Sequence, residues 1–489
     1  MKLTIKRLEL RAGRPVALLN ERRAAKLNVH IGDRIEVSKG SRKIIAVVDI
    51  VKDLLDDLEI SLSKETLSYL NAKPGESVEV NLALSPKSTN PILKKLNGQS
   101  LTREEIHEII TDIVNNSLTE AEIAYFVSAV YEKGMSLNET IYLTEAMYKT
   151  GKKLSWHSSQ IVDKHSIGGI PGNRTTPIVV SICAASGVIM PKTSSRAITT
   201  AAGTADVMDV ICHVNLSPEE LKSIVKKTNA CLAWGGSLGL APADDKLIRV
   251  ERLLNLDPES QLLASILSKK LAVGSKYVLI DIPCGEGAKV SKAEAAKLKS
   301  KFIKIAKHFE LNIQVVLTKG DQPIGNGIGP ILEILDILRV LKQENSPKDL
   351  ERKALFLASK ILEMTGKAKK GKGLQMAKEI LYSGAAYAKF NEIIDAQGRK
   401  SKPLVPARFR KEIKATKDGR VQKIENKILN KIGRILGSPA DKGAGMYIYV
   451  HKSDKVSKGD KLITFYSESE KKIKEAIAFY NQNKLIKLS

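Results

Sequence analysis

The chain has 489 residues, enough for several domains with a core in each. Its 79 Lys and Arg residues exceed its 54 Asp and Glu residues, and the formal net charge of +25 favours anionic partners such as phosphorylated small molecules. The basic residues are dispersed and aromatic residues make up only 4%, which argues against a nucleic-acid-binding protein. No apolar run reaches the ~18 residues of a membrane span, and no signal peptide is visible, so a cytoplasmic protein without membrane contact is expected.

The four cysteines are widely spaced, form no CxxC pair and stand mostly in apolar surroundings. They are Cys183, Cys212, Cys231 and Cys284. This pattern predicts buried thiols and neither a disulfide framework nor a metal site, and no cofactor is expected.

Residues 1–84 contain short β-like runs separated by turns such as IGD and KPGE. The runs are Lys2 to Leu10, Arg34 to Val37, Ile44 to Val51 and Ser77 to Leu82. They predict a β-rich, barrel-like domain. Because it holds no cluster of acid, base and nucleophile, a role in structure or assembly is favoured over catalysis.

Residues 88–158 show helical periodicity, and three segments begin with a capping box. The boxes pair Thr102 with Glu105, Thr119 with Glu122, and Ser136 with Glu139. Consecutive helices of this kind predict an all-α lobe that serves as a packing and dimer surface.

From 159 to 240 and from 276 to 406, strand-like runs alternate with helical segments. The runs lie at Ile161, Val188, Cys231, Tyr277 to Ile282 and Ile313 to Leu317. This alternation predicts an α/β domain whose sheet is parallel, or mixed but largely parallel, and is covered by helices. Residues 407–489 are basic, with short strands punctuated by turns, and predict a small α+β unit.

The segment from Gln160 to Asp209 carries two polar turns, each after an apolar run. DKHSIGG follows Ile161 and Val162, and SSRA follows Val188 to Met190. Strand, glycine-rich turn and helix together form a common anion site, and turns that follow parallel strands meet at one sheet edge. An ordinary strand-to-helix connection is the alternative. The turns, however, also supply a lysine, a histidine and five hydroxyls, which favours a phosphate pocket; the hydroxyls are those of Ser166, Thr175, Ser194, Ser195 and Thr204.

These turns resemble a known family. VDKHSIGG resembles the DKHSTGG loop of the thymidine phosphorylase family, and SSRAITTAAGTADVMD follows its second signature. The resemblance covers about residues 90 to 465 and includes KKLSW, ASILSKKLAVG, GEGAK, DQPIGNGIG and SGAAYAKFNEIIDAQG. The N-terminal extension and the segment from Leu254 to Ser260, with NLDPES, are most similar to the archaeal branch, the AMP phosphorylases.

The resemblance implies phosphorolysis, a pentosyl transfer. Phosphate would attack C1' of a nucleoside 5'-monophosphate, with AMP preferred and CMP and UMP also used, to give free base and ribose 1,5-bisphosphate. A thymidine or pyrimidine nucleoside phosphorylase is the alternative within the family. The resemblance also implies that residues 241–275 return to the helical domain, and that the chain forms a homodimer or larger homo-oligomer through its helical and N-terminal domains.

Phosphorolysis requires a site that holds a dianion beside a developing oxocarbenium ion. A lysine, hydroxyls and backbone N–H groups suit this task, and the resemblance assigns it to two loops. The candidates are Lys164, Ser166, Gly168, Gly169, Ser194, Ser195, Arg196, Ala197, Ile198, Thr199, Thr200 and Thr204. Ile167 replaces the family's threonine and IPGNR carries one extra residue, so the roles of Thr175 and Thr176 stay open.

The departing base needs a proton donor, because a purine leaves most readily when N7 is protonated. The resemblance points to Asp257 in NLDPES, while the residues alone favour a helix N-cap at Asp-Pro-Glu. His165 is the second catalytic candidate.

Arg249, Ser265 and Lys269 match the positions that contact base and sugar in the pyrimidine enzymes. Lys289 in GEGAK and Arg196 are candidates for recognising the 5'-phosphate. Ordinary surface salt bridges are the alternative for both.

Overall fold

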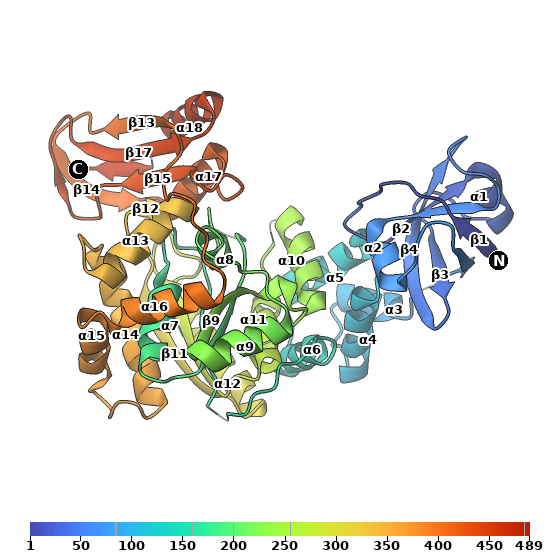
Figure 1. Ribbon diagram of the computed structural model, residues 1–489, viewed down its shortest axis with the longest axis horizontal. Coiled ribbons are helices and arrows are strands. Elements are labelled where there is room, and N and C mark those ends of the chain that lie inside the picture. Colours follow the sequence, from blue (N-terminus) through green and yellow to red (C-terminus); the bar gives the residue numbers. More distant parts are fainter. Residues whose placement is uncertain (84–85, 159, 199, 255, 484) are drawn as a thin grey trace. The chain divides into compact units, whose positions relative to one another are not determined.

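The computed structural model describes residues 1–83, 86–158, 160–198, 200–254, 256–483 and 485–489 (Figure 1). The chain forms two compact units. The first consists of Met1–Gly151 and Ala241–Ser268, and the second of Lys152–Leu240 and Lys269–Ser489.

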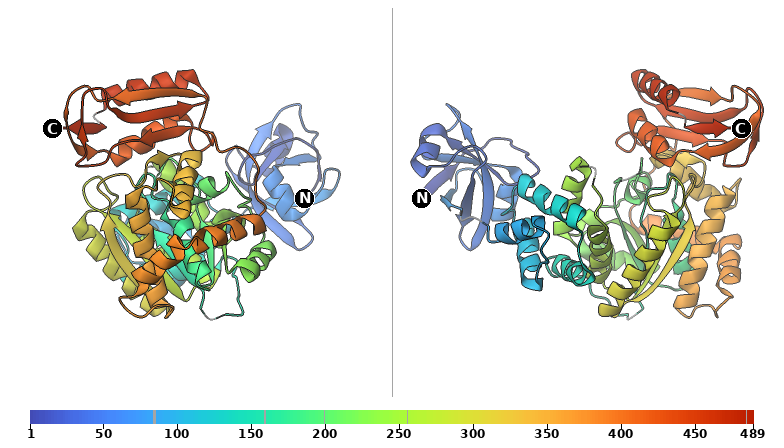
Figure 2. Two further views of the ribbon diagram at one scale, coloured as in Figure 1. Left: turned by 60° about the vertical axis from the view of Figure 1, so that its left-hand side comes forward. Right: turned by 180° about the vertical axis from the view of Figure 1, so that it is seen from behind.

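The first unit begins with a closed barrel of six short strands in the order β1-β5-β2-β4-β3-β6 (blue in Figure 2). They are β1 (Lys2–Ile5), β2 (Val16–Asn20), β3 (Arg34–Lys39), β4 (Arg42–Val51), β5 (Glu59–Leu62) and β6 (Ser77–Leu82), with helices α1 (Glu21–Leu27) and α2 (Lys64–Leu70). Alternate residues such as Leu3 and Ile5 point into the core, as a period of two requires. The predicted barrel is confirmed. Its first strand, however, ends at Ile5 and not at Leu10, because the charged pair Lys6-Arg7 interrupts the apolar pattern after Ile5.

The rest of the first unit is helical. It contains α3 (Thr89–Leu96), α4 (Arg103–Val114), α5 (Glu120–Lys133), α6 (Leu137–Lys149), α10 (Pro242–Leu254) and the first part of α11 (Glu259–Val273). All three predicted capping boxes form at the starts of α4, α5 and α6. On α4 the buried residues Ile106, Ile109, Ile110 and Ile113 make one helical face. Leu247 and Val250 of α10 join the same core, so the segment after residue 240 returns to this unit.

The second unit is built on parallel strands. They are β7 (Val162–Ser166), β8 (Met190–Ser194), β9 (Ala230–Trp234), β10 (Tyr277–Cys284) and β11 (Asn312–Lys319). Strands β11, β10 and β7 pair in parallel, as do β8 and β9, and a parallel bridge between Ile161 and Ile189 joins the two groups. The helices are α7 (Thr175–Ala185), α8 (Thr204–Met208), α9 (Pro218–Thr228), α12 (Lys292–His308), α13 (Pro330–Lys342), α14 (Lys348–Met364), α15 (Gly373–Tyr382) and α16 (Ala385–Ala396). The predicted parallel α/β arrangement is therefore confirmed.

The C-terminal part completes the second unit. It contains β13 (Phe409–Lys414), β14 (Gly419–Ile424), α17 (Asn426–Leu436), β15 (Gly445–Ile448), β16 (Lys455–Val456), β17 (Lys461–Ser467), α18 (Glu470–Gln482) and β18 (Ile486–Leu488). Its main sheet has the order β12-β15-β17-β13, and β12 (Gly327–Ile328) is supplied by the α/β part, so one sheet joins the two (Figure 1).

All four cysteines are buried free thiols, as predicted. In the part of the chain that the structure describes, no helix combines the length and the apolar character that crossing a bilayer requires.

Candidate active site

The first glycine-rich loop leaves the carboxyl end of β7. Gly168 and Gly169 have φ values of 89° and 87°, a region that side chains disfavour. The Ile167 N–H donates to the Asp281 carbonyl at 3.1 Å, which fixes the loop to the neighbouring strand β10. A Cβ on Gly172 would lie 2.2 Å from the Ile324 carbonyl oxygen, so only glycine fits there. The loop is thus held rigidly before α7 begins.

Lys164 lies in β7 with its side chain buried. Its Nζ donates to the hydroxyls of Thr175 (3.0 Å) and Thr176 (3.2 Å), in the first turn of α7. Both threonines therefore support this lysine. Burial lowers the pKa of Lys164 to about 7, although nearby Asp281 acts in the opposite direction.

A second buried group surrounds Asp163. Its carboxylate accepts from Lys270 Nζ at 2.6 Å and lies 3.3 Å from Lys192 Nζ. Burial alone would raise the pKa of Asp163, but the two lysines lower it below its usual value. Burial lowers the pKa of Lys270 to about 8, so its charge is costly to keep.

A third group lies on β10, where Asp281 is fully buried. Lys353 reaches it from α14, with Nζ 3.0 Å from Oδ2, and the Thr318 hydroxyl donates to Oδ1 at 2.6 Å. Asp281 thus has a hydrogen-bond partner at Oδ1 and an ion-pair partner at Oδ2, whereas the described hydrogen bonds of the Lys164 ammonium go to its two threonines.

Together these side chains form what we call the buried lysine cluster. Its members are Lys164, Lys192, Lys270, Lys353, Asp163 and Asp281, each less than a tenth exposed. Four ammonium groups face two carboxylates, so the cluster carries a formal excess of two positive charges when all are ionised. Buried charge without a counterion is expensive, and the cost is relieved by an anion that binds beside it. Two of its members, Asp163 and Lys164, lie in β7, the strand that leads into the glycine-rich loop.

His165 follows Lys164 and is half-buried. Removal from water and the charges of neighbouring lysines, Lys270 first among them, hold its pKa well below the usual value. The imidazole is therefore neutral at neutral pH. A neutral ring can donate or accept one hydrogen bond at each nitrogen but carries no spare proton.

The second loop leaves the end of β8 and is organised by Asp206. One carboxylate oxygen accepts from the backbone N–H groups of Ala197 (2.7 Å) and Gly203 (2.9 Å), and the other from Arg196 (3.1 Å). A Cβ on Gly203 would lie 2.4 Å from the Arg196 carbonyl carbon and 2.6 Å from the Ser195 oxygen. The loop closes tightly on itself and needs glycine at that position.

Arg196 makes three further contacts. Its guanidinium lies 3.2 Å from Asp209 Oδ2, donates to Asn215 at 3.4 Å and stacks 5.0 Å above the Trp234 ring. These contacts hold the second loop against the rest of the same unit. They favour the salt-bridge interpretation of Arg196 over a role in recognising the 5'-phosphate.

A buried ion pair connects the two loops. Arg174, which precedes α7, pairs with Glu333 of α13 and donates to the Ala202 carbonyl and, at 3.4 Å, to the Thr200 hydroxyl. Both partners of the pair are less than a tenth exposed. Burial raises the pKa of Glu333 in spite of Arg174. The prediction that the two turns lie side by side is thereby confirmed.

The remaining loop candidates are placed as follows. Ser194 and Thr204 are half-buried at the loop ends, whereas Ser195 is exposed. The Ile198 carbonyl accepts from Arg434 at 2.6 Å. Thr199 lies outside the described residues.

Lys289 lies beside the first loop. A Cβ on Gly169 would be 3.2 Å from Lys289 Cβ, so the stem of this lysine passes the glycine-rich turn. Ser166 is half-buried and accepts from Asn173 at 3.3 Å. Lys269 is half-buried near the end of α11, next to Lys270 of the cluster.

Three candidates belong to the first unit. Arg249 is exposed on α10 and donates to the Gly13 carbonyl at 3.3 Å, and Ser265 is half-buried on α11. Asp257 is exposed in the link between α10 and α11. Helix α11 begins at Glu259, and the Leu262 N–H donates to the Pro258 carbonyl at 3.0 Å, so Pro258 and not Asp257 holds the position next to the helix. This weakens the N-cap interpretation of Asp257; Asn255, which opens the motif, lies outside the described residues.

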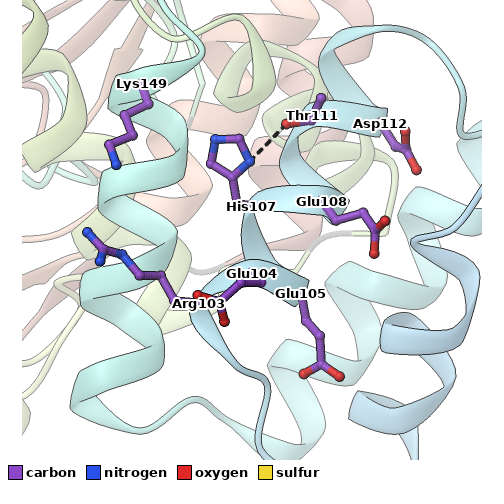
Figure 3. A pocket seen from close by; sticks show the side chains of 8 residues that line it. All are labelled: Arg103, Glu104, Glu105, His107, Glu108, Thr111, Asp112 and Lys149. Atoms are coloured by element: carbon purple, nitrogen blue, oxygen red, sulfur yellow. Dashed lines mark hydrogen bonds between the residues drawn. The ribbon is translucent and has the colours of Figure 1, made fainter.

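A separate surface hollow lies over α4 in the first unit (Figure 3). It is lined by Arg103, Glu104, Glu105, His107, Glu108, Thr111, Asp112 and Lys149. Its charged groups are engaged locally, for example Glu105 with Lys94 at 2.8 Å and Lys149 with Glu145 at 2.7 Å. Within the described residues no group of His, Cys, Asp and Glu is arranged to hold a metal ion, here or elsewhere.

Sequence reasoning missed several members of the buried lysine cluster. Lys192 closely follows the apolar run from Val188 to Met190, and Lys270 lies between apolar residues in ILSKKLAV. A charge at such a position is a usable signal. Lys353 offers no such signal, because the helix ERKALFLASK is amphipathic and a lysine there would ordinarily be exposed.

Comparisons with known proteins agree with this architecture. The helical bundle domain of the glycosyl transferase family matches residues 91–151, and the a/b domain of that family matches 158–387. The C-terminal domain of pyrimidine nucleoside phosphorylases matches residues 420–487. The solved structure of anthranilate phosphoribosyltransferase from Thermus thermophilus is similar in fold, with a TM-score of 0.53 at 18% identity over 63% of this chain and 98% of that one.

Full-length relatives are more similar. An AMP phosphorylase of Pyrococcus horikoshii is 46% identical, covering 100% of this chain and 98% of that protein. AMP phosphorylase 1 of Archaeoglobus fulgidus is 40% identical, covering 99% and 96%. Identity at this level extends through the barrel, the helical domain and both parts of the second unit, so the chain belongs to the AMP phosphorylase branch of the thymidine and pyrimidine nucleoside phosphorylase family.

Proposed function

We propose that the protein is a pentosyltransferase that cleaves nucleoside 5'-monophosphates, AMP in particular, with inorganic phosphate. An oxygen of phosphate forms a bond to C1' of the ribose, the bond from C1' to the base nitrogen breaks, and the base leaves with one proton. The products are free base and ribose 1,5-bisphosphate. Full-length similarity to AMP phosphorylases supports this proposal, and the buried lysine cluster is the observation that carries it.

The cluster explains why a phosphate dianion would bind at the first loop. Two unbalanced positive charges in a water-poor environment attract a dianion more strongly than the same charges in water would. Lys164 is held by two hydroxyls and no carboxylate at hydrogen-bonding distance in the described contacts, so its ammonium is available to pair with an anion. The glycine-rich turn adds backbone N–H groups, which place the nucleophile without any cofactor.

Departure of the base requires a proton at its leaving nitrogen. We assign this role to Asp257, because a carboxylic acid can supply the proton and the segment NLDPES is similar to that of the AMP phosphorylases. His165 is neutral and surrounded by lysines, so it is better suited to donate one hydrogen bond to a substrate oxygen than to act as a charged acid.

Recognition of the 5'-phosphate is assigned to Lys289. Its stem lies against Gly169 in the first glycine-rich loop, which places this lysine beside the candidate phosphate site. Lys289→Ala should raise the KM for AMP by roughly tenfold or more, as loss of a hydrogen bond to a charged group costs about 1.5–3 kcal/mol, with adenosine unaffected. Lys292→Ala is the control, since Lys292 is exposed at the start of α12. An unchanged KM for AMP in Lys289→Ala would remove this residue from the site.

The substrate class is tested by incubating the purified protein with inorganic phosphate and, separately, AMP, CMP, UMP, adenosine and thymidine, and measuring free base. Release from the monophosphates and not from the nucleosides is expected. Release from thymidine alone would favour the pyrimidine nucleoside phosphorylases as the model and refute the proposal. Assembly into a homodimer or larger homo-oligomer stays a prediction, to be checked by light scattering of the same preparation.

A further inference from the structure

Helix α17 of the C-terminal part lies against the loops of the α/β part, and one face of the helix makes the contacts. Asn426, Asn430, Gly433 and Arg434 follow one another at intervals of four, three and one residues, so they share this face. Asn426 and Asn430 are buried, which is unusual for asparagine unless its amide is hydrogen-bonded.

Asn430 contacts both candidate phosphate loops at once. Its Oδ1 accepts from the Ala201 N–H at 3.2 Å, and its Nδ2 donates to the Gly169 carbonyl at 3.4 Å. One amide therefore holds the first loop with its donor and the second loop with its acceptor. No other residue type of this size offers a donor and an acceptor in that arrangement.

The contact is reinforced further along the helix. A Cβ on Gly433 would lie 2.6 Å from Ala201 Cβ, so the helix approaches the second loop as closely as glycine permits. Arg434 donates to the Ile198 carbonyl at 2.6 Å, in the same loop.

Asn426, one turn earlier on the helix, contacts two further turns through its amide donor alone. Its Nδ2 donates to the carbonyls of Gly320 at 3.0 Å and Gly287 at 3.3 Å. Gly287 lies in the GEGAK turn that also carries Lys289, and Gly320 follows β11. Four turns at the carboxyl ends of the strands are thus tied to a single helix.

We propose that α17 is the scaffold that sets the spacing of the phosphate loops, and that Asn430 is a positioning residue for phosphate binding. This inference rests on the proposed function. Asn430 acts through Gly169 and Ala201 and need not touch the substrate. A shift of either loop would change the distance between Lys164 and the hydroxyls of the second loop. Groups that bind one anion jointly bind it more weakly when their spacing changes, so the affinity for phosphate would fall.

The test measures inorganic phosphate binding by calorimetry and the steady-state kinetics with AMP. Asn430→Ala is expected to raise the Kd and the KM for phosphate about 5- to 30-fold, as loss of one to two kcal/mol would, with a smaller change in kcat and in the KM for AMP. Asn483→Ala is the matched control. It also removes an asparagine hydrogen bond in the C-terminal part, from Nδ2 to the Phe479 carbonyl at 2.7 Å, but touches none of these loops.

A second pair of variants tests the same spacing by steric means. Gly433→Ala should weaken phosphate binding, and adding Ala201→Gly should restore much of it, because the second change removes the atom with which the new methyl collides. This pair keeps the inference testable if Asn430→Ala fails to fold.

The outcomes separate the two proposals. If the wild type binds phosphate and cleaves AMP while Asn430→Ala and Gly433→Ala bind phosphate as the wild type does, α17 is only a packing element and the inference is overturned. An equal loss of phosphate affinity in Asn483→Ala would also overturn it. A wild type that neither binds phosphate nor releases base overturns the proposed function, and this inference with it.

Discussion

Replacing Lys164 by methionine probes the centre of the buried lysine cluster. Methionine fills a similar volume without charge, so the threonines of α7 lose a donor while the packing is kept. Truncating one partner of a buried, hydrogen-bonded charge pair costs about 2–5 kcal/mol, which corresponds to a rise in the phosphate Kd of about 30-fold to a few thousand-fold. Lys276→Met serves as control, because Lys276 is an exposed lysine of the same unit.

The direction of the pH dependence follows from the lowered pKa. Below about pH 7 the Lys164 ammonium is charged and binds the anion, and as pH rises through about 7 the neutral amine binds it more weakly. Anion affinity should therefore fall on the alkaline side in the wild type and stay flatter in Lys164→Met. Sulfate is the better titrant here because its own charge is constant over this range, and calorimetry should show proton uptake on binding near neutral pH.

The same shift predicts an effect on stability of opposite sign to the effect on binding. In the unfolded chain Lys164 stays protonated up to its ordinary pKa of 10.5, whereas in the folded protein it loses its proton near pH 7. Its unfavourable contribution to the free energy of folding is therefore complete below pH 7 and becomes smaller as the pH rises above 7. Lys164→Met should thus raise the Tm of the phosphate-free protein at neutral or lower pH. A Kd for phosphate within about threefold of the wild type, together with an unchanged Tm, would refute the reasoning on the cluster.

Three further changes test other parts of the site. Lys353→Met should free Asp281 to pair with Lys164 and reduce the positive charge of the cluster, which raises the KM for phosphate and moves the alkaline decline of the pH profile to higher pH. Lys353→Arg keeps the charge, so its KM and pH profile should stay near those of the wild type. An unshifted pH profile in Lys353→Met would contradict the assigned pairing. Gly203→Ala should weaken phosphate binding severely, because its Cβ would lie only 2.4–2.7 Å from backbone atoms of the second loop. Gly235→Ala, whose Cβ would lie 3.7 Å from its nearest atom, should bind phosphate as the wild type does. Equal phosphate affinities of the two variants, measured by calorimetry, would show that the second loop does not require glycine at 203. Asp257→Asn should lower kcat for AMP by about 100- to 10,000-fold, because an amide cannot transfer a proton to the departing base. A kcat near the wild-type value would transfer the role of acid to another group.

Much of the architecture was determined by local sequence. The capping boxes at Thr102, Thr119 and Ser136 predicted helix starts to the residue, since a cap depends only on side chains three positions apart. Alternating strands and helices after residue 159 predicted parallel pairing, because a crossover helix leaves two strands pointing the same way. The glycine-rich turn at Gly168 and Gly169 was recognisable for the same reason, as its backbone conformation is encoded by the residues themselves.

Tertiary structure alone decided which distant charges meet. Lys353 joins Asp281 across 72 positions of chain, counting from 281 to 353, and nothing in either local segment marks the partnership. Asn430 reaches Gly169 across 261 positions and Ala201 across 229, so its place between two loops depends on how the C-terminal part docks on the α/β part. Local sequence determines backbone preference and the exposed or buried face of each element, whereas the counterion of a buried charge and the partner of a buried amide are fixed only when separate elements pack together.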